Sequence, residues 1–245
     1  MEPVFVLLHS PSVSPTTWHP VAEALRSRGR RAVVPSLTRL TEGDPPYWSR
    51  VVEIVTAVLP QEPLVLVPHS NAGLFIPLLV EALGERVTGC LFADAALPPS
   101  HGAVQAAEPE FLPFLRGLAD DAGLLPRWTD WWDEDAVAAL LPDETVRRSV
   151  VGEQPRLPLA YYLQEVPVPS GWDRAPCSYL WFSTPYGKTA AEAARRGWPT
   201  HRIPGEHLHQ LFAPEAVADW LLTSSPADAA SASQKGSPTS GADEK

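Results

Sequence analysis

Short, wholly apolar runs alternate with segments of helical periodicity over the first part of the chain. Runs with the length and composition of buried parallel strands lie at residues 4–8, 31–35, 64–67 and 87–94. Segments with apolar positions at helical spacing lie between them, at residues 18–27, 47–59 and 71–83. Strands that alternate with helices predict βαβ units and a parallel sheet. Pro77 falls inside the third helical segment, where we expect a kink.

The alternation stops after Pro98 and resumes near Pro176. The intervening segment has no convincing apolar β-run, but it has helical stretches at residues 111–118, 133–141 and 143–150. Strand and helix patterns then return at residues 178–183, 189–197, 200–203 and 214–222. We therefore predict an α/β fold: a mainly parallel sheet of about six strands with helices on both faces and a helical cap inserted after the fourth core strand.

These boundaries divide the chain into three parts. Residues 1–97 and 177–223 are predicted to form the α/β core, and residues 98–176 the helical cap. Residues 224–245 contain almost no large apolar side chain, which predicts a disordered tail.

The composition of the chain argues against some classes of binding partner. The formal net charge of −10 argues against binding to nucleic acid or to an anionic membrane surface. The N-terminus has no basic and apolar leader, and no apolar run approaches the length that crosses a bilayer, so we expect a cytoplasmic protein. The nine tryptophans indicate large apolar surfaces in a core or around a pocket.

The third strand runs into a serine flanked by small residues. Ser70 follows residues 64–67 after Pro68 and His69, Ala72 and Gly73 come after it, and an apolar helix follows. A nucleophilic serine on such a strand-turn-helix elbow needs small neighbours, because the turn is tight and lifts the hydroxyl above the edge of the sheet. The alternative is that Ser70 only caps the helix. Pro68 departs from the usual elbow, which has glycine there.

The order of these features resembles the α/β-hydrolase superfamily, and most closely its small cap-bearing group of methylesterases and hydroxynitrile lyases. The resemblance covers the opening strand that ends in His9, the elbow at Ser70, the cap, and a late loop with a histidine. It implies hydrolysis or related acyl chemistry without fixing a substrate.

The superfamily places its catalytic histidine in the loop that precedes the last helix. In this chain that loop reads Gly205-Glu206-His207-Leu208-His209, and its glycine and leucine favour His207 over His209 as the base. An imidazole is needed there because a serine hydroxyl is a poor nucleophile until a base accepts its proton.

The acid departs from the family pattern. The strand at residues 178–183 leads into Thr184-Pro185-Tyr186-Gly187-Lys188, without the aspartate that commonly follows it. Asp94 ends the preceding core strand, where a known variation places the acid, and a carboxylate at the end of an apolar strand needs a partner such as His207. The alternatives are that Asp94 only turns the chain, or that the site is a dyad without an acid.

The oxyanion hole is also unusual. One donor is expected to be the N–H of Asn71, directly after the nucleophile. The other normally comes from the loop after the first strand, where Pro11 has no N–H, so Ser10 or alternatively Ser12 must donate.

Residues expected to line the substrate pocket are His9 from the first strand and Trp128, Trp132 and Tyr162 from the cap. The sequence carries no metal-ligand cluster, phosphate loop or dinucleotide fingerprint, so we expect no metal and no cofactor.

These features favour a serine hydrolase that cleaves an ester or thioester of a bulky apolar acyl group, a small-molecule substrate, through an acyl-enzyme. One alternative is a cofactor-free lyase or cyclase that uses the serine and histidine for acid–base chemistry. Another is a non-catalytic ligand-binding protein on the same fold.

Overall fold

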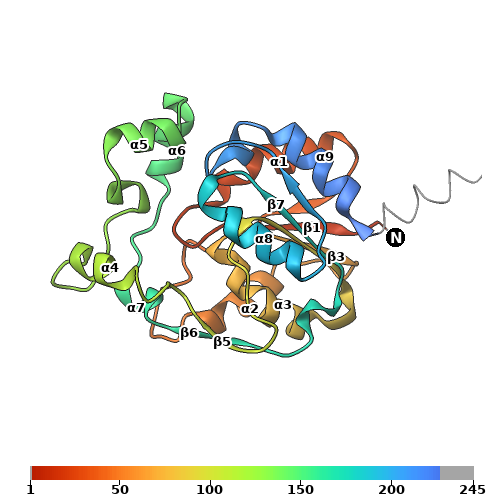
Figure 1. Cartoon of the computed structure of the whole chain (residues 1–245), viewed down its shortest axis with the longest axis horizontal. Helices are drawn as coiled ribbons and strands as arrows, with labels where there is room; N and C mark the ends of the chain where they lie inside the picture. The colour runs from red at the N-terminus through yellow and green to blue at the C-terminus, as the bar shows by residue number, and fades with distance from the viewer. Residues whose placement is uncertain (1, 227–245) are drawn as a thin grey trace, which may run out of the picture.

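A parallel sheet forms the centre of the computed structural model, which describes residues 2–226 (Figure 1). Within those residues the sheet has six strands, and every pair of neighbours is parallel. In spatial order they are β2 (Ala32–Val33), β1 (Val4–Leu8), β3 (Leu64–Ser70), β4 (Val87–Ala95), β7 (Cys177–Trp181) and β8 (Thr200–Arg202). The predicted α/β fold and parallel sheet are confirmed.

The order of the strands in the sheet indicates where a ligand site is expected. The chain starts at β1, moves out to β2 and then returns to the other side of β1 with β3. In open α/β sheets ligands bind where the order reverses, above the carboxyl ends of the strands. Here that point lies between β1, which leads into Ser10, and β3, which ends at Ser70.

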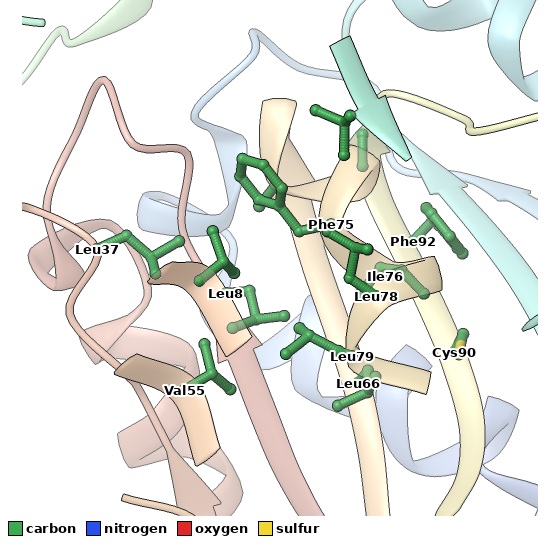
Figure 2. Close-up of a cluster of buried hydrophobic side chains, with 14 of the residues drawn as sticks. Leu8, Leu37, Val55, Leu66, Phe75, Ile76, Leu78, Leu79, Cys90 and Phe92 are labelled. Atoms are coloured by element: carbon green, nitrogen blue, oxygen red, sulfur yellow. The ribbon is translucent and has the colours of Figure 1, made fainter. Parts of the chain in front are cut away.

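Helices cover both faces of the sheet. One face carries α1 (His19–Ser27) and α9 (Pro214–Ser224), and the other carries α2 (Trp48–Thr56), α3 (Ile76–Leu83) and α8 (Gly187–Arg195). Side chains that alternate along β1 contribute to the cores on both faces of the sheet. Phe5 and Leu7 pack toward α1, whereas Val6 and Leu8 pack toward α2 and α3. Figure 2 shows the second of these cores, where Leu66 and Phe92 of the sheet meet apolar side chains of the helices.

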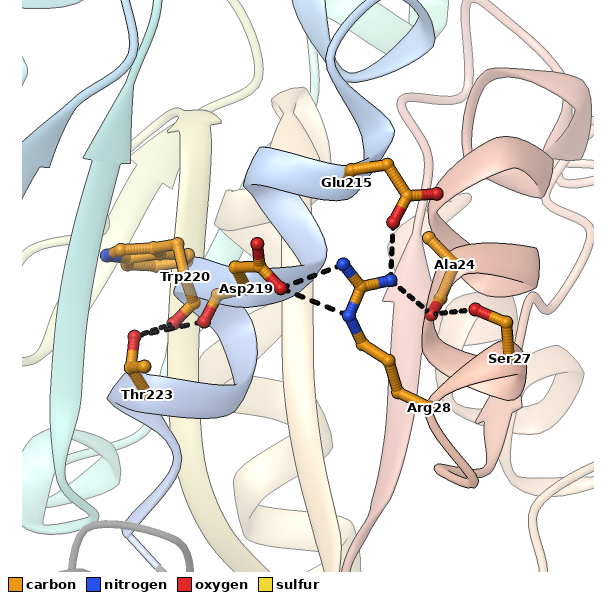
Figure 3. A network of polar contacts seen from close by, with 7 residues as sticks. All are labelled: Ala24, Ser27, Arg28, Glu215, Asp219, Trp220 and Thr223. Atoms are coloured by element: carbon orange, nitrogen blue, oxygen red, sulfur yellow. Dashed lines mark hydrogen bonds and ion pairs between the residues drawn. The ribbon is translucent and has the colours of Figure 1, made fainter.

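An ion-pair network joins the two helices of the first face. The Arg28 guanidinium, at the end of α1, lies 2.5 Å from the Glu215 carboxylate and 2.8 Å from that of Asp219, both on α9 (Figure 3). It also donates to the carbonyl oxygen of Ala24 at 2.8 Å. The network lies at the surface, so apolar packing between α1 and α9 contributes more to their association.

The segment between β4 and β7 is not purely helical, contrary to the prediction. It contains α4 (Leu112–Leu118), α5 (Glu134–Leu140), α6 (Glu144–Gly152) and α7 (Leu159–Tyr162), and also an antiparallel pair of strands, β5 (Gly102–Gln105) and β6 (Glu165–Val168). These strands are short and largely solvent-exposed along β5, and Pro167 lies in β6, so neither produces an apolar run in the sequence. We call residues 98–176 the cap. Helices α4, α5 and α6 lie to one side of the sheet (Figure 1).

Two further expectations need correction. Pro77 lies in the first turn of α3, where a proline causes no kink, because a separate 3-10 helix (Asn71–Phe75) comes first. At the C-terminus α9 runs to Ser224 and Ser225 is fully buried, so ordered packing passes the predicted boundary at residue 223. Residues 227–245 of the predicted tail lie outside the described residues.

Both cysteines, Cys90 and Cys177, are free and buried. No helix within residues 2–226 combines the length and apolarity needed to cross a bilayer.

Candidate active site

Ser70 is held on a strained elbow. It is the last residue of β3 and has φ 57° and ψ −135°, a backbone conformation that residues other than glycine rarely adopt. Its carbonyl oxygen accepts a hydrogen bond of 2.9 Å from the N–H of Ala96, which fixes the turn against β4. A Cβ at Gly73 would lie 1.9 Å from the carbonyl oxygen of Ala96, so only glycine fits there.

Asp94 has the second unusual backbone. Among the described residues, Ser70 and Asp94 are the two non-glycine residues with positive φ, 57° and 43°. The register between β3 and β4 shifts at this point, where His69 pairs with Ala93 and Ser70 with Ala95. The skipped residue is Asp94, and this bulge turns its carboxylate toward the end of β7.

Four hydrogen bonds converge on the Asp94 carboxylate, which is fully buried. Oδ1 accepts from the N–H groups of Phe182 at 2.8 Å and Ser183 at 3.2 Å. Oδ2 accepts from the Ser183 hydroxyl at 2.6 Å and from His207 Nδ1 at 2.7 Å. Burial opposes ionisation, but the hydrogen bonds from His207, Ser183 and Phe182 outweigh it and hold the pKa of Asp94 below its ordinary value.

These contacts explain the missing acid after β7. The position that commonly carries an aspartate in the resembled family is occupied here by Ser183 and its neighbours, which donate to Asp94 instead. Sequence reasoning missed Ser183. A hydroxyl at that point of the strand, in place of the expected carboxylate, is the signal that could have identified it.

His207 is oriented from several sides. Asp94 accepts from Nδ1, which leaves Nε2 without a proton and able to act as a base. The ring stacks on Tyr186, with centroids 4.9 Å apart and an angle of 4° between the planes. The His69 ring lies on it as well, with centroids 4.5 Å apart. Trp128 packs edge to face with the His207 ring, with centroids 6.0 Å apart.

His69 supports His207 through the backbone. Its Nε2 donates to the carbonyl oxygen of His207 at 2.8 Å. Burial, followed by the nearby His207, lowers the pKa of His69 to about 3, so this ring is neutral and does not act as the base.

Ser70 and His207 line one cavity. No hydrogen bond joins Ser70 Oγ to His207 Nε2 in the part of the chain that the structure describes, as is common for catalytic pairs before substrate binds. The Tyr186 phenol, which sequence reasoning missed, interacts with the Ser70 hydroxyl, and burial raises the pKa of this phenol. The alternative base, His209, lies instead beside Phe182, with ring centroids 5.8 Å apart.

His9 is not a pocket residue, contrary to expectation. It is fully buried, its Nδ1 donates to the carbonyl oxygen of Ser10 at 2.7 Å, and its Nε2 accepts from the N–H of Leu37 at 2.9 Å. Desolvation lowers its pKa to about 4. With both ring nitrogens bound to the backbone, His9 fixes the loop after β1.

The two oxyanion candidates flank the cavity. The N–H of Asn71 opens the 3-10 helix, where backbone donors have no partner within the helix. On the β1 loop the N–H of Ser12 donates to Ser10 Oγ at 3.4 Å. This engagement favours the N–H of Ser10 over that of Ser12 as the second donor.

The cap contributes aromatic side chains to the cavity, whose volume is about 1020 Å³. The predicted pocket residues Trp128, Trp132 and Tyr162 all line it, together with Phe111 and Trp131. A mostly apolar wall with a few converging polar groups is typical of a small-molecule site.

Part of this chain is similar in sequence to known proteins. No family model matches it. Over 108 residues it is 33% identical to Esterase PIR7B of rice (Oryza sativa subsp. japonica). This alignment covers 38% of this chain and 39% of that protein. Over 107 residues it is 27% identical to polyneuridine aldehyde esterase of Rauvolfia serpentina, 40% of each chain. The matched segments thus span about two fifths of these curated relatives.

Solved structures resemble the whole fold. An extracellular α/β-hydrolase from a Paenibacillus species, reported to share structural and functional homology with tobacco salicylic acid binding protein 2, has a TM-score of 0.72. It is 17% identical and covers 92% of this chain and 100% of its own. The chain therefore has the α/β-hydrolase fold. Within that fold it is similar to the methylesterase-like group, which includes polyneuridine aldehyde esterase.

Proposed function

We propose that this protein is a serine hydrolase that cleaves an ester or thioester of a bulky apolar acyl group. The observation that carries the proposal is the chain of contacts behind the cavity, in which buried Asp94 accepts from Nδ1 of His207 and leaves Nε2 free in the cavity that Ser70 also lines. Two curated esterases that match part of the chain support the reaction class.

In the first half of the reaction His207 Nε2 accepts the Ser70 proton while Oγ bonds to the substrate carbonyl carbon. The carbonyl oxygen becomes an oxyanion that accepts hydrogen bonds from the N–H groups of Asn71 and Ser10. The intermediate then collapses, the bond to the leaving oxygen or sulfur breaks, and the His207 proton passes to that atom.

In the second half a water molecule loses its proton to His207 as its oxygen attacks the acyl carbon. The new intermediate expels Ser70 Oγ, which takes the proton back, and the carboxylic acid leaves. Throughout, Asp94 stabilises the imidazolium without being protonated itself, consistent with its lowered pKa.

The aromatic wall supports the choice of acyl group. Trp128, Trp131 and Trp132 line a cavity of about 1020 Å³, more than a short acyl chain fills. We therefore expect kcat/KM to rise from acetyl to hexanoyl to 2-naphthoyl esters of p-nitrophenol.

The test is hydrolysis of that series by the wild type and by Ser70→Ala and His207→Ala. We expect each variant to lose at least about 10³-fold in kcat. Ser27→Ala and His201→Ala, at exposed positions, serve as matched controls and should keep wild-type rates. Turnover of the wild type that survives in Ser70→Ala would contradict the proposal, and binding without turnover would favour the non-catalytic alternative.

Trapping distinguishes the lyase or cyclase alternative. Mass spectrometry of wild-type protein quenched during turnover of the 2-naphthoyl ester should show one added acyl group on Ser70. Turnover that depends on Ser70 but never yields this adduct would favour acid–base chemistry without an acyl-enzyme.

A further inference from the structure

Two adjacent tyrosines of the cap contact both sides of the expected oxyanion hole. Tyr161 and Tyr162 end α7, and their rings pack edge to face with centroids 4.8 Å apart. The Tyr161 hydroxyl donates to Oδ1 of Asn71, on the nucleophile elbow. The Tyr162 hydroxyl lies 2.7 Å from Oγ of Ser12, on the loop after β1. One short cap helix thus bonds to the two segments that must face each other across the substrate oxygen.

The Asn71 side chain is fixed at both ends. While Oδ1 accepts from Tyr161, Nδ2 donates to the carbonyl oxygen of Ala106, just beyond β5, at 2.9 Å. The amide that follows the nucleophile is therefore bonded to two elements of the cap. Because the Asn71 N–H belongs to the same residue, these bonds limit the directions in which it can point.

The loop after β1 is fixed in a similar way. Ser12 contacts Tyr162 through its hydroxyl and donates its N–H to Ser10 Oγ at 3.4 Å. Pro11 lies between them and offers no N–H, so the loop depends on Ser10 alone for a donor. A small displacement of this loop would move that donor out of range of the oxyanion.

We propose that Tyr161 and Tyr162 are positioning residues that hold the two halves of the oxyanion hole at the separation required by a tetrahedral intermediate. The inference rests on the proposed function, since it takes Asn71 and Ser10 as the donors. It makes the cap part of the catalytic apparatus as well as the wall of the pocket.

Other roles fit Tyr161 less well. Tyr161 is fully buried, so it offers no surface to a substrate. Burial raises the pKa of both phenols, so neither exchanges protons near neutral pH. What remains for Tyr161 is its bond to Asn71, and this bond can be removed without loss of the ring.

The test uses Tyr161→Phe and Tyr162→Phe with two matched probes, 2-naphthylboronic acid and 2-naphthol. The boronate forms a tetrahedral adduct with an activated serine and places an oxygen in the oxyanion hole, whereas the naphthol only fills the pocket. We expect each variant to bind the boronate about 10-fold more weakly, which corresponds to about 1.4 kcal/mol. The affinity for 2-naphthol should change less than about 2-fold, because this probe places no oxygen in the oxyanion hole. Tyr47→Phe, a buried tyrosine of the core, is the control and should bind both probes like the wild type.

A double-mutant cycle asks whether Tyr161 acts through Asn71. Asn71→Ala keeps the backbone N–H but removes the side chain that Tyr161 contacts. If the pair acts as a unit, Tyr161→Phe should weaken boronate binding in the wild type and add little in the Asn71→Ala background. The pair Tyr162→Phe and Ser12→Ala forms a second cycle, which decides the matter if thermal melts show that Tyr161→Phe does not fold.

The outcomes separate this inference from the proposed function. Boronate binding that is equally strong in Ser70→Ala would contradict both, because no serine adduct would form. Binding that depends on Ser70 but is unchanged in both phenylalanine variants would overturn the positioning role alone. An equal loss for the boronate and for 2-naphthol would also overturn it, since the tyrosines would then shape only the pocket.

Discussion

Backbone strain is concentrated at two residues of the site. Ser70 and Asp94 both have positive φ and lie on neighbouring strands, at the shift in register between β3 and β4. A non-glycine residue in such a conformation costs on the order of 1–3 kcal/mol and persists only where its surroundings enforce it. At Asp94 the enforcing contacts are the four hydrogen bonds on its carboxylate. The strain therefore serves to direct this carboxylate to His207.

The variant Asp94→Asn tests that assignment. The amide would present donors where Ser183 and His207 also donate, so His207 would lose the tautomer that keeps Nε2 free. We expect kcat for the best ester to fall by about 10⁴-fold. Asp121→Asn, at an exposed position, is the control. A loss of less than about 10-fold would mean that Asp94 is not the triad acid.

Local sequence identified some of these residues and not others. Ser70, Asn71 and His207 could be predicted because their neighbours along the chain define an elbow and a loop. The partners Ser183 and Tyr161 could not, because they lie 89 and 90 residues from the groups that they contact. His9 was assigned to the pocket wrongly, since its position at the end of β1 does not reveal that both nitrogens bind the backbone.

At the scale of elements, the nucleophile elbow depends on close contact between two chain segments. The 3-10 helix after Ser70 passes over the end of β4 at Gly73, where the carbonyl oxygen of Ala96 occupies the place of a side chain. The sequence predicted the small residue and the strand before it. It did not predict the 3-10 turn, because that turn follows from packing on β4 rather than from local preference.

Gly73→Ala should therefore impair folding and activity together. The added Cβ would lie 1.9 Å from the Ala96 oxygen, and relief requires movement of the backbone at the nucleophile. We expect a loss of about 3 kcal/mol or more in the free energy of unfolding, measured by urea denaturation. In Gly117→Ala, on α4, the Cβ would meet no atom within 4 Å, so stability should be unchanged or slightly higher. Similar stability of the two variants would contradict the packing argument.

The cap shows where sequence patterns lose information. Its helices α5 and α6 were predicted within one or two residues, and in the structure Asp133 and Asp143 cap them through side-chain hydrogen bonds. The β5–β6 pair was missed because it is stabilised by its own backbone pairing and by contact with α3, not by a local apolar run.

At the scale of the whole molecule, two buried neutral histidines make stability depend on pH. Burial lowers the pKa of His9 to about 4 and that of His69 to about 3, whereas in the unfolded chain both are near 6.5. Below pH 6.5 the unfolded state therefore binds protons that the folded state does not. It follows that stability falls as the pH falls from 6.5 toward 4.

Each proton taken up on unfolding contributes about 1.4 kcal/mol per pH unit. We expect the two histidines together to lower the free energy of unfolding by about 2.7 kcal/mol per pH unit between about pH 5.5 and 4.5. Urea denaturation across that range measures the slope. His69→Gln should reduce the slope by about half, and His201→Ala, on exposed β8, should leave it unchanged. A slope near zero in the wild type would show that these rings are not held neutral.

The proposed hydrolase mechanism depends above all on Ser70 being an activated nucleophile, and covalent labelling measures this. The wild type, Ser70→Ala and His207→Ala are incubated with a fluorophosphonate, and each intact mass is measured, with peptide mapping of any adduct. We predict a single adduct on the wild type, located at Ser70 and absent from both variants. A folded wild type that forms no adduct, or one that reacts at another residue, would contradict the serine hydrolase mechanism.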